Sequence, residues 1–279
     1  MDEKKKSLIQ FLSSLALLMI AYIPMFRWMI DRWVLPESYY GHGMLIPLVS
    51  GYVLWQRKDA LKEAKISSEF FGLIIVAGCL ITHLLCALLK IYFVSGFSFV
   101  LAIFGLVLFF LGKDMAKKVI FPVFFLFAMI PLPLVLISNL TVKLKLIAAQ
   151  IATLILNNIG FPAVRDGSII AMPNSYIAVE APCSGLRSLI SLLTLGVVFA
   201  FAAKVSYLKK GVLLAASVPI AMATNVLRII MLATVNDLYG EKIAMGFFHD
   251  FSGFFVFAFA FAGLYIVVKA LEPKGIVNE

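Results

Sequence analysis

The stretch APCSGLRS, from Ala181 to Ser188, places a cysteine where a long apolar helix should begin. The unpaired N–H groups at a helix start carry partial positive charge, so they favour the thiolate form of Cys183. A thiolate is a nucleophile that can attack a carbonyl carbon. Because a cysteine in an apolar chain is also an ordinary packing residue, a catalytic role requires partners.

Two residues farther along the chain could supply that partnership. Arg228 interrupts an apolar run and His249 opens the last one. With Cys183 they would form a thiol nucleophile, an imidazole acid/base and a cation able to stabilise an oxyanion. Asn225 lies three residues before Arg228 on roughly the same helical face, where it could steady the guanidinium. Arg187, four residues after the cysteine, is the rival cation.

The composition indicates that these residues lie on membrane-spanning helices. Of the 279 residues, 62% are hydrophobic and 14% are charged, and the mean hydropathy is +1.02. Soluble domains average about 45–50% apolar and about 25% charged residues. We therefore expect an all-α polytopic membrane protein forming a single domain over residues 1–279, whose chemistry-bearing half is about 161–268. The +9 net charge reads as a topology signal, so no nucleic acid is expected as a partner.

The apolar runs predict about eight transmembrane helices. They are approximately Leu8–Ile23, Tyr40–Trp55, Phe70–Leu89, Ile91–Leu111, Val119–Ser138, Ser184–Ala203, Gly211–Val235 and His249–Val268. The fifth run contains Pro131 and Pro133, which predict an early exit or a re-entrant turn. No soluble domain, internal repeat or long linker is expected.

Residues 139–180 should form a short extracytoplasmic segment. From Asn139 to Gly160, polar and apolar residues alternate as in an amphipathic helix on the membrane surface, although a ninth span is the alternative. The β-prone runs Ser168–Met172 and Tyr176–Val179 flank turn residues, so they predict a small hairpin.

Orientation and depth place the reactive residues together. Most of the 24 Lys and Arg residues fall on one side of eight crossings, which predicts that both termini are cytoplasmic. The distance from Gly211 to Arg228 is roughly 26 Å along a helix, in a core about 30 Å thick. Arg228 therefore lies near the outer surface, where its long side chain could alternatively snorkel to the headgroups. Cys183 and His249 open their helices at the same depth.

The remaining polar residues suggest supporting roles. His42 opens the second span between two glycines, and Asp250 follows His249. His83 is expected to be a hydrogen-bonded interior residue, and Cys79 and Cys86, seven residues apart, should pack on one helical face. No histidine stands at ligand spacing from a cysteine or carboxylate, so neither a metal nor a cofactor is expected.

Three blocks resemble the signature of the exosortase/archaeosortase family. They are PCSGLRSL from Pro182, NVLRI from Asn225 and HDFSG from His249. The run YYGHGMLIPLVSGYVLWQRK, beginning at Tyr39, also resembles the N-terminal block of bacterial exosortases. The sequence departs slightly from the family pattern at Pro182, where a small residue is often found.

This resemblance implies a membrane-embedded cysteine protease or transpeptidase acting on exported proteins. Its substrates would carry a C-terminal sorting signal: a motif such as Pro-Glu-Pro, a transmembrane helix and a basic tail. By position, Cys183 would be the nucleophile, Arg228 the oxyanion-stabilising cation and His249 the acid/base. Arg165 and Arg187 could receive an acidic residue of the motif. The acceptor would be water, an amine or a lipid headgroup, and the active site would face outward from the plasma (inner) membrane.

Two other classes of function use the same residues differently. A transporter or lipid-handling protein could employ Arg228, His249 and Asp250 to bind an anionic headgroup or carry protons. Transporter sites lie near the membrane midplane, however, whereas these residues cluster at one face. A rhomboid-like serine protease would pair Ser184 with His249, but a serine here is typical of a helix-start cap.

Overall fold

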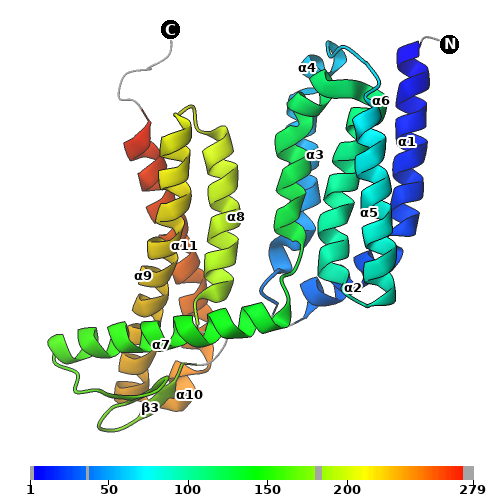
Figure 1. Cartoon of the computed structure of the whole chain (residues 1–279). Helices are drawn as coiled ribbons and strands as arrows, with labels where there is room; N and C mark the ends of the chain where they lie inside the picture. Colours follow the sequence, from blue (N-terminus) through cyan, green and yellow to red (C-terminus); the bar gives the residue numbers. More distant parts are fainter. Residues whose placement is uncertain (1–2, 36–37, 180–183, 273–279) are drawn as a thin grey trace. The chain divides into compact units, whose positions relative to one another are not determined.

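The chain divides into two compact units, Met1–Pro133 and Leu134–Glu279. The computed structural model describes residues 3–35, 38–179 and 184–272 (Figure 1). The blocks that contain Arg228 and His249 belong to the second unit, whereas the block that begins at Tyr39 belongs to the first.

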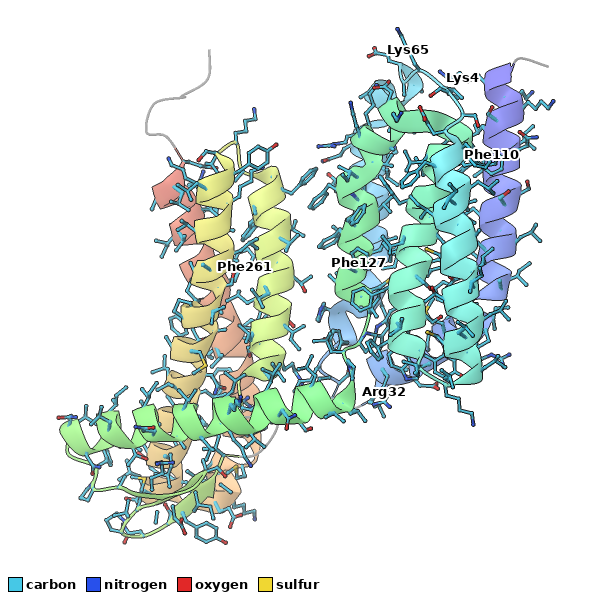
Figure 2. The ribbon with its side chains drawn as sticks, in the orientation of Figure 1. Lys4, Arg32, Lys65, Phe110, Phe127 and Phe261 are labelled. Carbon is cyan, nitrogen blue, oxygen red and sulfur yellow. The ribbon has the colours of Figure 1, made fainter. Side chains whose placement is uncertain are left out.

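Every regular element among the described residues of the first unit is a helix. Its elements are α1 (Glu3–Ala21), α2 (Ile23–Val34), the 3-10 helix η1 (Gly41–Met44), α3 (Leu45–Gln56), α4 (Lys58–Lys62), α5 (Phe70–Leu88), α6 (Tyr92–Phe125) and the 3-10 helix η2 (Leu126–Met129). Figure 2 shows Lys4 and Lys65 at one end of this unit and Arg32 at the other. The predicted topology assigns the two lysines to the cytoplasmic side and Arg32 to the outer side.

A buried polar cluster holds the bend between α1 and α2. The two helices meet at an angle of 65°, and Tyr22 lies between them, fully buried. Its hydroxyl donates to the Cys79 carbonyl at 3.2 Å, and its ring stacks on His83 at 3.8 Å. His83 in turn contacts Ser95 Oγ at 2.6 Å. His83 is thus the hydrogen-bonded interior residue that its position predicts, and Cys79 and Cys86 are free and buried on α5.

Helix α6 turns back on itself at Gly112. This residue has φ +87, and a Cβ there would collide with Ser67, so the turn requires glycine. The two legs then pair in opposite directions: Phe104 packs on Phe124 with ring centroids 5.2 Å apart. Phe97 likewise packs on Phe127, with ring centroids 5.2 Å apart. The predicted runs 91–111 and 119–138 correspond to these legs, but the second ends at η2, before the two prolines.

The second unit combines helices with a small sheet. Its elements are α7 (Leu134–Asn158), β1 (Val164–Asp166), β2 (Ile169–Ala171), β3 (Tyr176–Ala178), α8 (Leu186–Ala202), α9 (Tyr207–Tyr239), α10 (Glu241–Ala244) and α11 (Phe247–Leu271). The strands form an antiparallel sheet in the order β1-β2-β3, with Ile170 opposite both Arg165 and Ile177. The predicted hairpin is β2–β3, and β1 is a third strand that the sequence did not reveal.

Two apolar cores fix α9 in the second unit. One joins small residues of α7 to the sheet and to the C-terminal half of α9, and it includes Ala152, Ile170 and Ile229. The other joins α8, α9 and α11 through Leu192, Leu213 and Leu264, among others. The sheet is also tied to α9 by polar contacts: Asp237 Oδ1 accepts the Asn174 N–H at 3.0 Å, and Asn236 donates to the Tyr176 carbonyl at 2.9 Å. Helix α9 is therefore held on both sides.

The polytopic helical fold is confirmed, with fewer candidate spans than the eight predicted. Within the described residues, five helices are long and apolar enough to cross a membrane, or six if the bent α1–α2 pair forms one span. The runs predicted at 40–55 and 184–203 became α3, with 12 residues, and α8, with 17. At about 1.5 Å per residue, α3 covers only about 18 Å. This count also takes α6 as one helix, although its two legs run in opposite directions.

Helix α7 is the predicted amphipathic segment. Its length and composition would allow it to cross a membrane. Within its unit, however, it runs across α8, α9 and α11, as Figure 1 shows. Transmembrane helices tilt by at most about 40° from the bilayer normal. If α8, α9 and α11 cross the bilayer, α7 therefore lies along its surface, which favours the interfacial alternative.

Candidate active site

The structure brings Arg228 and His249 into direct contact. Arg228 lies in the C-terminal half of α9, and His249 lies in the first turn of α11. Nη2 of Arg228 is 3.1 Å from Nε2 of His249 and donates to the His249 carbonyl at 3.2 Å. Both residues are half-buried. The contact therefore joins the guanidinium of α9 to the imidazole of α11, and the two groups come from separate sequence motifs.

The geometry of this contact determines the form of the imidazole. A guanidinium has only donors, so Nε2 of His249 must accept the hydrogen bond. The ring proton then lies on Nδ1, and the imidazole in this arrangement is neutral. Arg228 thus orients the ring and holds the lone pair on which a base would accept a proton.

Ser252 completes the cluster and was not among the predicted site residues. It is 2% exposed. Its hydroxyl donates to the His249 carbonyl at 2.8 Å and accepts from Nε of Arg228 at 3.2 Å. Ser252 follows His249 by three residues in HDFSG, so both lie on one face of a helix. That spacing was the available signal.

Within the described residues, the contacts of Arg228 leave part of its guanidinium for another ligand. The contacts described above use Nε and Nη2 of Arg228. Among the residues that the structure describes, no carboxylate forms an ion pair with Arg228. Its positive charge and its Nη1 donors are therefore suited to an anionic group.

The start of α8 packs against α9 one turn away from Arg228. Cys183 itself lies outside the described residues, but Ser184 and Gly185 follow it directly. Ser184 is fully buried, and its hydroxyl accepts the Leu186 N–H at 3.3 Å. A Cβ on Gly185 would lie 2.9 Å from Cγ of Asn225. Asn225 is 1% exposed, so it lies between the two helices. Ser184 thus has the local role of a helix-start residue.

Gly185 offers a test of this close approach. Its φ of +80 is strained for any other residue, and the Asn225 contact leaves no room for a methyl group. The strain should destabilise the Gly185→Ala variant by about 1–3 kcal/mol or more. The thermal unfolding midpoint of the purified variant in detergent should therefore lie below that of the wild type. Gly211→Ala is the matched control, because a Cβ there meets nothing within 4 Å and removal of a helical glycine should stabilise. Equal midpoints for the two variants would contradict the packing described.

The two arginines predicted to assist differ in their surroundings. Arg187, in the first turn of α8, is half-buried, and within the described residues its Nε is buried without a hydrogen-bond partner. Arg165 on β1 is exposed and donates to the Gly167 carbonyl of its own turn at 2.8 Å. Arg187 is therefore the better placed of the two to bind an acidic group.

His42 and Asp250 are the last two predicted residues. His42 lies in η1 of the first unit, where its ring stacks on Tyr40 at 6.0 Å. Burial lowers the pKa of the His42 imidazole, which favours its neutral form. Asp250 belongs to α11, but its side chain lies outside what the structure describes.

A comparison with protein families matches this chain to one of them. The model of the transmembrane exosortase family covers residues 28–266, which include both the first-unit block and the Arg228–His249 pair. No curated protein and no solved structure matches the chain. Because the family match spans most of the 279 residues, the chain belongs to the transmembrane exosortase family.

Proposed function

We propose that this exosortase is a cysteine protease or transpeptidase that processes C-terminal sorting signals of exported proteins. The observation that carries the proposal is the contact between Arg228 and His249, at 3.1 Å, in a chain of this family. It couples a guanidinium to an imidazole where α11 begins, and the α8 start that follows Cys183 packs one helical turn away on α9. These are the groups that acyl transfer through a thiol requires.

In the first half-reaction the Cys183 sulfur attacks the carbonyl carbon of the scissile peptide. The thiol proton passes to Nε2 of His249, whose lone pair Arg228 holds in the resting arrangement. Arg228 must release that lone pair, and the oxyanion forming on the substrate offers its guanidinium a better partner because it carries full negative charge. Collapse of the tetrahedral intermediate transfers the proton to the leaving amine and leaves a thioester on Cys183.

In the second half-reaction an acceptor attacks the thioester. His249, neutral again, removes a proton from the acceptor, and Arg228 stabilises the second oxyanion. Water would give hydrolysis, whereas an amine or a lipid headgroup would give transpeptidation. Ser252 acts as a positioning residue throughout, because it contacts both the guanidinium and the His249 carbonyl.

Arg187 is our candidate for binding an acidic residue of the sorting motif. Its buried Nε lacks a partner among the described residues, and a substrate carboxylate would satisfy it with a charge-assisted hydrogen bond. We propose that this site faces the outer side of the plasma (inner) membrane, because the basic residues gather at the opposite, predicted cytoplasmic ends.

The activity can be tested by co-expression in a host that has no exosortase. The substrate is an exported protein with an N-terminal tag, a Pro-Glu-Pro motif, a transmembrane helix and a basic tail. Immunoblotting should show a shorter tagged product only when the chain is present. A second substrate, with the motif replaced by Gly-Ser-Gly but the helix and tail retained, should stay intact.

Two outcomes would oppose the proposal. Identical processing in cells without the chain would show that a host protease is responsible. An intact substrate, together with uptake or export of a headgroup analogue that depends on Arg228, would instead favour a transporter or lipid-handling protein. The assay thus separates the two classes of function.

A further inference from the structure

We propose that the first unit binds an anionic phospholipid in a groove between α1, α3 and α6, with the headgroup held by Lys4, Lys58 and Lys62. This site is independent of the proposed catalytic residues, which lie in the second unit. The groove has a volume of about 570 Å³. Its walls are almost wholly apolar and include Phe11 and Val107.

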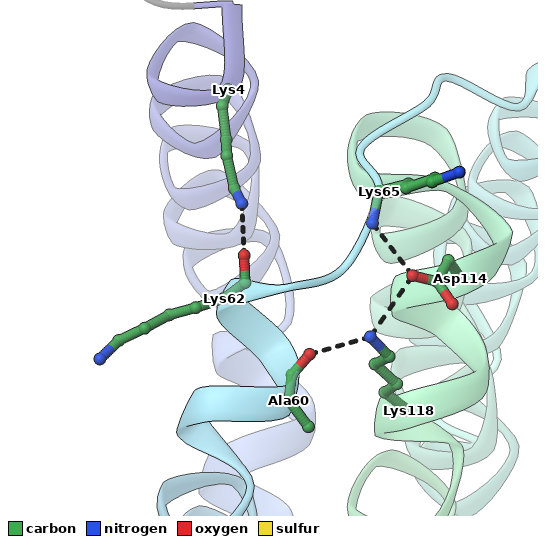
Figure 3. Close-up of polar contacts among 6 residues, drawn as sticks. All are labelled: Lys4, Ala60, Lys62, Lys65, Asp114 and Lys118. Carbon is green, nitrogen blue, oxygen red and sulfur yellow. Dashed lines mark hydrogen bonds and ion pairs between the residues drawn. The ribbon is translucent and has the colours of Figure 1, made fainter.

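The lysines are confined to one end of the groove. Lys4 opens α1, and Lys58 and Lys62 open and close α4. All three are exposed where they line the rim. Figure 3 shows the Lys4 ammonium donating to the Lys62 carbonyl, which draws α1 to α4. The positive-inside rule places this end in the cytoplasm, where the leaflet is anionic.

The charges of Lys4, Lys58 and Lys62 are available to a ligand, whereas the charge of Lys118 is paired. Lys118 pairs with Asp114 at 3.4 Å, and Figure 3 shows that Asp114 also accepts the Lys65 N–H. Within the described residues, neither Lys4 nor Lys58 forms an ion pair. Lys62 contacts Asp59 at 3.4 Å, but both side chains are about three-quarters exposed, at 75% and 76%, so that pair contributes little.

Ser50 adds an unpartnered polar group to the apolar wall of the groove. It lines the wall, is 5% exposed, and its hydroxyl has no hydrogen-bond partner among the described residues. Buried hydroxyls are usually partnered. The oxygen atoms of a phospholipid would supply an acceptor that the protein wall does not.

The charge at the rim selects a lipid over a substrate helix. Acyl chains are thin enough to enter. The tail of a sorting signal is basic, so three lysines at the rim would repel it. An anionic headgroup above apolar chains matches both ends of the groove.

Binding can be measured on the purified full-length protein in detergent. Native mass spectrometry would count retained dioleoylphosphatidylglycerol, with dioleoylphosphatidylcholine as the neutral comparison, and the thermal midpoint would be recorded with each lipid. We expect the wild type to retain the anionic lipid and to gain several degrees from it by linkage. The Lys4→Gln/Lys58→Gln/Lys62→Gln variant should bind it at least about tenfold more weakly.

A charge-matched control separates a site from general attraction. Lys65→Gln/Lys113→Gln/Lys117→Gln removes three positive charges from the same end, but none of these residues lines the groove. It should retain the lipid. Equal loss in both triple variants, or equal retention of the neutral lipid, would overturn the proposal.

A variant of the wall tests the groove itself. Leu54→Phe fills space on the groove wall without changing charge, and Leu54 is only half-buried. It should therefore weaken retention of the anionic lipid while the lipid-free midpoint stays near that of the wild type. If this variant unfolds, Ser50→Leu provides a second filling change on the same wall. A shift from dimer to monomer on filling, without a change in lipid retention, would mean that a second copy of the chain occupies the groove, and would overturn the lipid assignment.

Discussion

Replacing Cys183 with serine is expected to reduce processing of the co-expressed substrate by about 10⁴-fold or more, to background on an immunoblot. The hydroxyl of serine is far less acidic than a thiol, so His249 cannot generate a comparable nucleophile. In enzymes whose catalytic residues act together, removal of the nucleophile lowers the reaction rate by a factor of this order. Cys183→Ala should behave in the same way, because neither variant can form the thioester.

The other two cysteines provide matched controls for this prediction. Cys79 and Cys86 are buried on α5 of the first unit, so each tests the loss of a thiol without touching the proposed site. Cys79→Ser and Cys86→Ser should retain processing once expression is normalised. Ser184→Ala should also retain most activity. Full processing by the Cys183→Ser variant would instead support a serine nucleophile. So would loss of processing in a Ser184→Ala variant that still folds.

Replacing Arg228 with alanine is expected to slow processing by about 10²–10³-fold, the usual effect of removing one oxyanion donor. It also frees His249 from the contact that orients its ring. Arg228→Lys should recover little, because one ammonium cannot reproduce the contacts of Nε with Ser252 and of Nη2 with His249. Both effects should appear in the rate of processing at saturating substrate.

A control for charge and one for folding make this measurement decisive. Arg165→Ala also removes a positive charge from the second unit, but that side chain is exposed and bonded to its own turn. It should process substrate nearly as fast as the wild type. Thermal midpoints would show whether Arg228→Ala is folded. A folded Arg228→Ala variant with normal rates would exclude Arg228 from the chemistry.

Some structural features were predictable because they depend on local pattern. Apolar runs of 18 or more residues require helices in lipid, so α5, α9 and α11 were expected close to their observed bounds. The turn residues between two β-prone runs likewise predicted the β2–β3 hairpin. The first strand was missed because its three residues, Val164–Asp166, are exposed and include only one β-branched residue, and it pairs with β2.

Other features depended on contacts between distant residues. The sequence predicted separate fourth and fifth spans, but not that Gly112 would bring Phe104 onto Phe124. It indicated that Arg228 and His249 share one depth, yet depth does not determine which side chains meet. The spacing of Ser252 after His249 puts both on one helical face, but the sequence did not show that the Ser252 hydroxyl contacts the Arg228 guanidinium.

The sequence by itself determined the membrane setting, the helical class and the family, because hydrophobic length and short ordered motifs are local properties. It also nominated Cys183, Arg228 and His249. Only the tertiary structure decided that α9 is held between two cores, that Arg228 donates to His249, and that the imidazole accepts that bond in its neutral form. The reason is physical. Packing of α9 against α8 and α11 sets the rotation of each helix about its axis, and that rotation sets the distance between side chains. A hydrogen bond requires this distance to be right to within a fraction of an ångström.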